Sequence, residues 1–217
     1  MIKFFFSSIG QKIQIAFTGL SLAIFLIFHL FNNLVLFTGA DNFNKMVQFL
    51  KSIHLFVRIL EVGLVLIILL HVINAIATTI KNKKANNGKY AIETNTATKS
   101  SKTMIWSGMV ILFFFIIHLR YYWYTFQNMT KDADFFAVML KNEFGFLGHT
   151  PTALFYIVAI LLISAHLKHG FISVFKTLGV SMKYRDSLIK YLAFVFWAII
   201  PLGFILIIIS IQFGIIS

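Results

Sequence analysis

The chain has 217 residues, of which 59% are hydrophobic and only 12% are charged. A water-soluble domain of this size needs more polar surface, so the composition excludes that class and indicates an integral membrane protein. The chain contains no cysteine, which excludes disulfides, thiolate metal sites, iron–sulfur ligation and a cysteine nucleophile within it. The net charge is +12, an excess that in a membrane protein reflects topology rather than nucleic-acid binding.

Five apolar stretches dominate the sequence. Before them, residues 1–12 have no small-residue cleavage site after a short apolar core, so we expect an amphipathic terminus and not a signal peptide. Each stretch has roughly 20 or more residues, which is enough to cross a bilayer. The predicted spans lie near residues 13–37, 57–80, 104–126, 152–175 and 190–213. The sequence therefore predicts an all-α integral membrane protein, with residues 1–217 forming a single membrane domain built as a five-helix bundle.

The distribution of basic residues predicts how the bundle is oriented. If the N-terminus is cytoplasmic, the cytoplasmic segments hold 13 of the 19 basic residues but only two of the seven acidic ones. These 13 are Lys3, Lys12, Lys81, Lys83, Lys84, Lys89, Lys99, Lys102, Lys168, Lys176, Lys183, Arg185 and Lys190. Lysine and arginine concentrate on the cytoplasmic side of membrane proteins, so five spans then place the C-terminus outside.

Each of the first four spans contains one deeply placed histidine. These are His29, His71, His118 and His166. An imidazole in hydrocarbon is costly unless something binds it, so ionisable residues inside a membrane indicate a functional site. For any one of them a hydrogen-bonded core histidine is the alternative, but four on four helices favour ligation.

Helix geometry sorts these histidines into two levels. We call His29 and His118 the outer pair, and His71 and His166 the inner pair. The outer pair lies 17 residues after Lys12 and 16 residues after Lys102, which at 1.5 Å per residue is roughly 25 Å. The inner pair lies 10 residues before Lys81 and Lys176, roughly 15 Å by the same rise.

Two imidazoles at one depth on opposing helices can bind a haem iron from both sides. The sequence therefore predicts two b-type haems, with the outer and inner pairs as axial ligands of the iron. Filling both axial positions leaves no open site, so such a haem transfers electrons only. His169 lies three residues after His166 on a similar side of the helix and is the alternative fourth ligand. His54 and His149, near the outer ends of spans, are expected to be interfacial.

Two further groups of polar residues are candidates for contacts to cofactor or substrate. Gln14, Ser173 and Lys176 lie at a depth suited to the propionates of an inner haem, although Lys176 equally fits a topology anchor.

A quinone pocket needs an apolar slot and a few proton-exchanging groups, and the outer candidates are Asn32, Asn33, Asp41 and Glu61. Glu61 is the leading proton carrier because it lies just inside a span. The alternative for Glu61 is a helix-start carboxylate stabilised by the helix dipole. The fifth span has Pro201 and no histidine, so we expect packing or a kink there and no chemistry.

The chain resembles the di-haem cytochrome b membrane anchor of succinate:quinone oxidoreductases, in the five-helix single-polypeptide form, over nearly its whole length. The matching stretches are FLIFHLFNN around His29 with GADNFNK after it, EVGLVLIILLH ending at His71, GMVILFFFIIHLR around His118, FYIVAILLISAHLKHG around His166, and a KTLG-like stretch ending at Gly179. His169 departs from the family pattern.

The resemblance implies that His71 and His166 bind the haem nearer the cytoplasm and that His29 and His118 bind the outer haem. It also implies a flavoprotein and an iron–sulfur subunit docked on the cytoplasmic face, and a bacterial inner membrane as the location. Electrons from succinate would then reach a membrane quinone, typically menaquinone, and fumarate reduction would be the reverse path.

Three alternatives remain from the sequence. One is the anchor of a quinol:fumarate reductase. Another is the di-haem cytochrome b of a different quinone-linked enzyme, which typically pairs its ligands on fewer helices. A transporter using histidines as proton relays would be expected to show broken helices or internal carboxylates.

Overall fold

The computed structural model describes residues 5–86, 99–179 and 186–217. These residues include no β-strand, which confirms the predicted all-α class. Five helices are long and apolar enough to cross a membrane, as predicted, and they cover Ser8–Thr38, His54–Lys84, Met104–Asn128, Thr150–Thr177 and Ser187–Gln212. Five of the charged residues used for the orientation lie outside the described residues: Lys3, Lys89, Glu93, Lys183 and Arg185.

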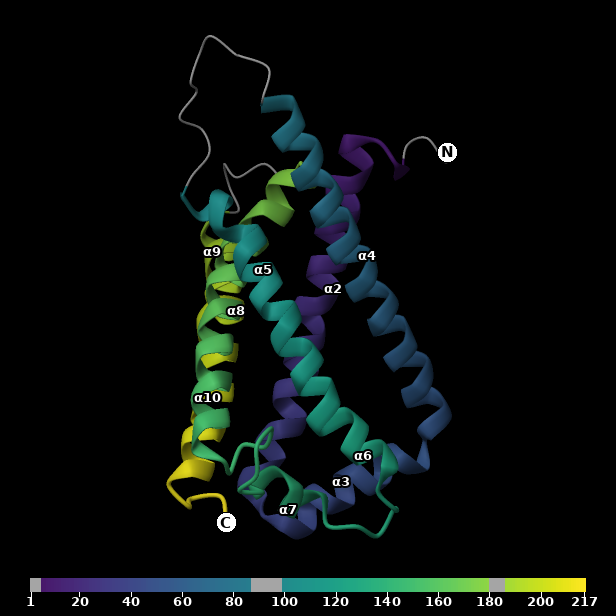
Figure 1. Ribbon diagram of the computed structural model, residues 1–217, viewed down its shortest axis with the longest axis vertical. Coiled ribbons are helices and arrows are strands. Elements are labelled where there is room, and N and C mark those ends of the chain that lie inside the picture. The colour runs from purple at the N-terminus through teal and green to yellow at the C-terminus, as the bar shows by residue number, and fades with distance from the viewer. Residues whose placement is uncertain (1–4, 87–98, 180–185) are drawn as a thin grey trace.

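The spans correspond to successive helical elements (Figure 1). The elements are α2 (Ser8–Leu34), the 3₁₀ turn η1 (Val35–Thr38), α3 (Ala40–Ser52), α4 (His54–Asn86), α5 (Lys99–His118), α6 (Tyr124–Asn128), α7 (Phe135–Leu140), α8 (Thr150–Thr177), α9 (Asp186–Phe194) and α10 (Ile200–Gln212). Two π-helical segments, Leu119–Trp123 and Val195–Ile199, join α5 to α6 and α9 to α10.

Four of the helices form a bundle, and the fifth span covers one side of it. α2 packs along α4 and α8, α5 packs along α8, and α10 lies over α2 and α8. α4 and α5 touch only sparingly, and α4 diverges from α2 toward the lower end of the molecule in Figure 1. α2 and α5 are therefore diagonal partners, and so are α4 and α8. Large side chains such as Phe17, Leu66 and Phe113 point outward, as a lipid-facing surface requires.

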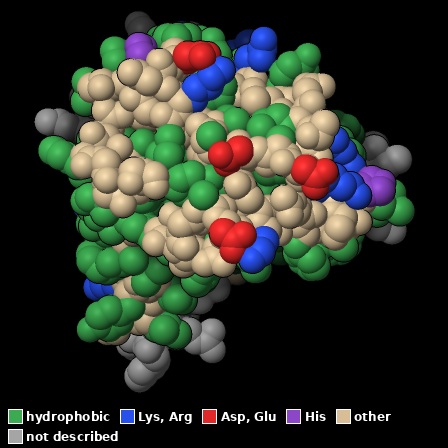
Figure 2. All heavy atoms as spheres, turned by 90° about the horizontal axis from the view of Figure 1, so that it is seen from below, with side chains coloured by type: hydrophobic (Ala, Val, Ile, Leu, Met, Phe, Trp, Pro, Cys, Tyr) green, Lys and Arg blue, Asp and Glu red, His purple; other side chains and the backbone are tan. Residues whose placement is uncertain are grey.

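Short helices close one end of the bundle, which we call the capped end; the opposite end, where α2 begins, we call the lysine-rich end. In the cap, Asn44 of α3 accepts a hydrogen bond from the Phe136 amide (2.9 Å) and donates to the Asp134 carboxylate (3.0 Å). Asp134 caps α7 through the Ala137 amide. The hydrogen bonds from the Asn44 side chain and from the Ala137 backbone N–H hold the pKa of Asp134 below its usual value. Figure 2, an end-on view of the capped end, shows acidic and basic side chains side by side there.

The fifth span contains a proline whose effect on the backbone is compensated by α8. Pro201 has no N–H, so position 201 cannot donate to the carbonyl of Trp197 four residues earlier. The Ser164 hydroxyl of α8 donates a hydrogen bond to that carbonyl. The π-helical segment ends just before the proline. Pro201 thus leaves the Trp197 carbonyl without its usual donor inside the span, and a hydroxyl from a neighbouring helix replaces that donor.

We expect Ser164→Ala to destabilise the protein by about 1 kcal/mol, since the Trp197 carbonyl loses a donor that lipid cannot replace. In a Pro201→Ala background position 201 regains its N–H, so the same Ser164→Ala change should cost less. Thermal unfolding of the four proteins in one detergent measures this coupling. Equal costs in both backgrounds would contradict the compensation.

Candidate functional site

The outer pair meets in the middle of the bundle. His29 of α2 and His118 of α5 have ring centres 5.7 Å apart, and their ring planes cross at 88°. They come from diagonal helices, so their rings face each other across the bundle axis. Two imidazoles that each bind one metal through a nitrogen at about 2 Å have ring centres about 6 Å apart. The observed separation is close to that value, and rings in crossed planes can both point a nitrogen at one ion.

Aromatic rings surround the outer pair. Phe25 stacks on His29 at 5.4 Å and Phe204 of α10 lies 5.5 Å from it. His118 lies among the rings of Phe114, Tyr122 and Tyr156, whose centres are 4.9–6.2 Å from one another or from the centre of the His118 ring. The Tyr156 hydroxyl is 3.5 Å from the Nδ1 of His118. Apolar and aromatic linings with few polar groups are typical of cofactor pockets.

The inner pair is held differently, by hydroxyl groups. The His71 Nδ1 lies 3.0 Å from the Thr18 hydroxyl of α2. The His166 Nδ1 lies 3.3 Å from the Ser107 hydroxyl of α5. His71 and His166 belong to α4 and α8, the other diagonal of the bundle.

These contacts measure the separation of the two levels. His71 reaches α2 at Thr18, eleven residues before His29, and His166 reaches α5 at Ser107, eleven residues before His118. At 1.5 Å per residue the inner level lies about 16 Å along both helices from the outer level. The two-level arrangement predicted from sequence depth thus has a counterpart in side-chain contacts.

The donor set suits a metal held by two imidazoles. Imidazole nitrogens bind iron, copper and zinc, and a haem iron needs only two axial ligands from the protein. No cluster of three or more histidine, aspartate or glutamate side chains able to hold a bare metal ion occurs among the described residues. Two facing imidazoles are the number of protein ligands that a haem iron would need.

The residues predicted to contact propionates differ in their surroundings. Gln14 lies one turn from Thr18, where its amide donates to the Phe5 carbonyl (2.8 Å) and accepts from buried Asn74 of α4 (3.2 Å). Ser173 and Lys176 are exposed on the last turns of α8. The structure therefore places Gln14 beside the inner pair in an existing hydrogen-bond network.

Glu61 sits in a three-residue cluster that joins α4 to α6. Its carboxylate pairs with Arg58 (2.8 Å) and accepts from the Gln127 amide (3.1 Å). Arg58 also donates to Gln127 (2.5 Å) and lies 5.6 Å from the Trp123 ring centre. Glu61 is partly buried at the capped end, consistent with its predicted place just inside a span.

The other predicted quinone contacts lie apart from this cluster. Asn33 donates to the His29 carbonyl (2.8 Å), Asn32 is exposed, and exposed Asp41 pairs with Lys45 at 2.6 Å. The structure joins none of them to Glu61 by a hydrogen bond or ion pair among the described residues.

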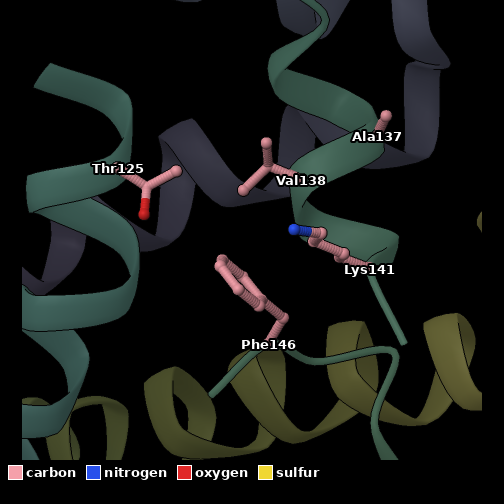
Figure 3. Close-up of a pocket in the computed structure, with 5 residues that line it drawn as sticks. All are labelled: Thr125, Ala137, Val138, Lys141 and Phe146. Atoms are coloured by element: carbon pink, nitrogen blue, oxygen red, sulfur yellow. The ribbon is translucent and has the colours of Figure 1, made fainter. Parts of the chain in front are cut away.

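A shallow pocket of about 240 Å³ opens in the cap between α6 and α7 (Figure 3). Thr125, Ala137, Val138, Lys141 and Phe146 line it. The Lys141 ammonium lies 5.3 Å from the Phe146 ring centre and pairs with Glu143 at 2.8 Å. None of the paired histidines lines this pocket, so we assign it no role in their chemistry.

The remaining histidines have ordinary surroundings. His54 is exposed at the start of α4, and His149 precedes α8 with its Nδ1 2.9 Å from the Thr152 hydroxyl. Both lie at the capped end. His169 is partly buried on α8, and no hydrogen bond of its ring is seen within the described residues.

Sequence reasoning missed the residues that hold the imidazoles: Thr18, Ser107 and Tyr156. A signal was present for two of them, since Thr18–Gly19 precedes His29 by the same interval that Ser107–Gly108 precedes His118. No protein-family model, curated protein or solved structure matches the chain. Function must therefore be inferred from its own residues.

Proposed function

We propose that this chain is the membrane anchor and di-haem electron-transfer subunit of a succinate:quinone oxidoreductase, with menaquinone as the quinone. The observation that carries the proposal is the placement of four partly buried histidines on four helices at two levels, with the outer rings 5.7 Å apart. A haem whose two axial positions are filled exchanges single electrons and does no bond chemistry.

The chain's own residues supply positions and surroundings. His29 and His118 hold the outer site, with the aromatic rings around them excluding water. His71 and His166 hold the inner site, with Thr18 and Ser107 behind them. Two sites about 16 Å apart along the bundle suit electron transfer through the membrane rather than catalysis at one centre.

The lysine-rich end suits soluble partners. Under the proposed orientation this end faces the cytoplasm of a bacterial cell and meets a flavoprotein and an iron–sulfur subunit. The described basic residues there include Lys12, Lys81, Lys84 and Lys176, all exposed. A positive surface favours association with acidic partners or anionic lipid. The loops between α4 and α5 and between α8 and α9, predicted to be strongly basic, lie partly outside the described residues.

The test of the proposal is succinate-driven reduction in native membranes. Succinate should produce the optical change of reduced low-spin b-type haem, and the chain should co-purify with a flavoprotein and an iron–sulfur protein. A purified chain with no haem spectrum would refute the cofactor assignment. A haem-containing chain that succinate leaves oxidised would instead indicate a different quinone-linked enzyme.

The paired geometry predicts the haem content of four variants. His29→Ala or His118→Ala should remove one haem, and His71→Ala or His166→Ala the other, so each falls from two per chain to one. Each variant removes one of the two axial nitrogens that a site needs. Haem extraction and pyridine haemochrome spectra measure the content.

His169→Ala is the matched control for this series, because it removes an imidazole from the same helix as His166. It should keep both haems. Loss of a haem from His169→Ala together with retention of both in His166→Ala would move the fourth ligand to His169.

Glu61→Gln should lower quinone reduction by about 100-fold if this carboxylate delivers protons, since general acid–base groups contribute 10²–10⁴. Both haems should remain. The control is Glu143→Gln, which neutralises another ion-paired carboxylate at the capped end. Steady-state quinone turnover with succinate decides, and an unchanged rate in Glu61→Gln excludes the residue from the mechanism.

A further inference from the structure

The hydroxyl beside each histidine of the inner pair already donates a hydrogen bond to a backbone carbonyl of its own helix. The Thr18 hydroxyl lies 2.6 Å from the Gln14 carbonyl of its own helix. At that distance the two oxygens would repel unless a hydrogen lay between them, so the hydroxyl donates to the carbonyl. A hydroxyl has one hydrogen, and it must therefore act as an acceptor toward the His71 Nδ1 at 3.0 Å.

Ser107 has the same arrangement on α5. Its hydroxyl donates to the Met104 carbonyl at 3.0 Å and lies 3.3 Å from the His166 Nδ1. With its hydrogen on the carbonyl, each hydroxyl presents only lone pairs to the ring, and the hydrogen of that contact then lies on Nδ1. In a neutral imidazole this leaves the lone pair on Nε2, the nitrogen that points away from the hydroxyl.

A glycine follows each hydroxyl, and at Gly19 it gives the imidazole room to approach. A Cβ at Gly19 would lie 3.2 Å from the His71 Cε1, a tighter contact than most real Cβ atoms make. A Cβ at Gly108 would lie 3.7 Å from the His166 Cε1, an ordinary van der Waals contact. The hydroxyl is thus the feature that both rings share, on two helices that are diagonal partners.

We propose that Thr18 and Ser107 are positioning residues that hold His71 and His166 as the Nδ1–H tautomer, leaving both Nε2 lone pairs free to bind a metal. The proposed tautomer rests on these hydrogen-bond distances and on no property of a bound metal. Its use in binding haem iron rests on the proposed function. Partners of this kind orient a ligating histidine and raise its basicity, and their loss typically weakens metal binding 10–100-fold.

The first experiment reads the tautomer without any haem. The haem-free full chain, labelled with ¹⁵N-histidine, is compared by NMR at neutral pH with His71→Gln and His166→Gln, which assign the two rings. Wild type should show a protonated Nδ1 and an unprotonated Nε2 at both. Thr18→Val, which keeps the branched shape, should abolish that preference at His71 only, and Ser107→Ala at His166 only.

Two further sets of variants separate the positioning role of the hydroxyls from general damage to the fold. Thr18→Ser and Ser107→Thr restore a hydroxyl and should keep the wild-type tautomer. Thr79→Val and Ser21→Ala remove hydroxyls that also bond a carbonyl of their own helix, at 2.8 and 2.9 Å, and should change neither ring.

The second experiment titrates haem into the same proteins. Thr18→Val and Ser107→Ala should each weaken binding at one of two sites by 10–100-fold, while Thr18→Ser and Ser107→Thr bind like wild type. An Nε2–H tautomer at either ring of the wild type, or a tautomer unchanged in Thr18→Val, overturns the positioning role. If the wild type binds no haem, the proposed function fails while the tautomer measurement still decides the role of both hydroxyls.

Discussion

The bundle depends on satisfying polar groups where no water is available. An unbonded polar group in hydrocarbon costs several kcal/mol, so each one needs a partner within the protein. His71 and His166 obtain hydroxyls from α2 and α5, and the Trp197 carbonyl obtains one from Ser164 of α8. Each of these bonds also fixes how far one helix is turned and shifted against the next. The polar contacts therefore set the register that generic apolar surfaces leave open.

That register links the two histidine levels. α2 carries both Thr18, whose hydroxyl contacts His71 of the inner pair, and His29 of the outer pair. α5 repeats this with Ser107 and His118 at the same spacing of eleven residues, about three turns. Eleven residues bring both side chains to nearly the same face of a helix, turned inward. Moving either helix by one turn would therefore disrupt an inner contact and an outer one together, so the levels are built as a unit.

The sequence predicts the features that depend on position along a helix axis better than the features that depend on rotation about it. Span number and histidine depth are distances along the chain, and hydrophobic length and helix rise are sufficient for them. The hydroxyl partners, the Gln127 partner of Glu61 and the Asn74 partner of Gln14 depend on how each helix is rotated. Nearly uniform apolar composition gives little information on rotation. The cap formed by α3 and α7 was not predicted, because its helices are short and its core joins distant segments.

The cluster around Glu61 shows what a proton-carrying role would require of the protein. The carboxylate is tied to Arg58 and Gln127, which also bond each other. A proton reaching it would end its ion pair, leaving the guanidinium near an apolar region. Arg58 retains two other contacts in that event, the Gln127 oxygen and the face of Trp123. The guanidinium thus keeps two partners of its own at the capped end, which is what the proposed proton-carrying role of Glu61 would require of its surroundings.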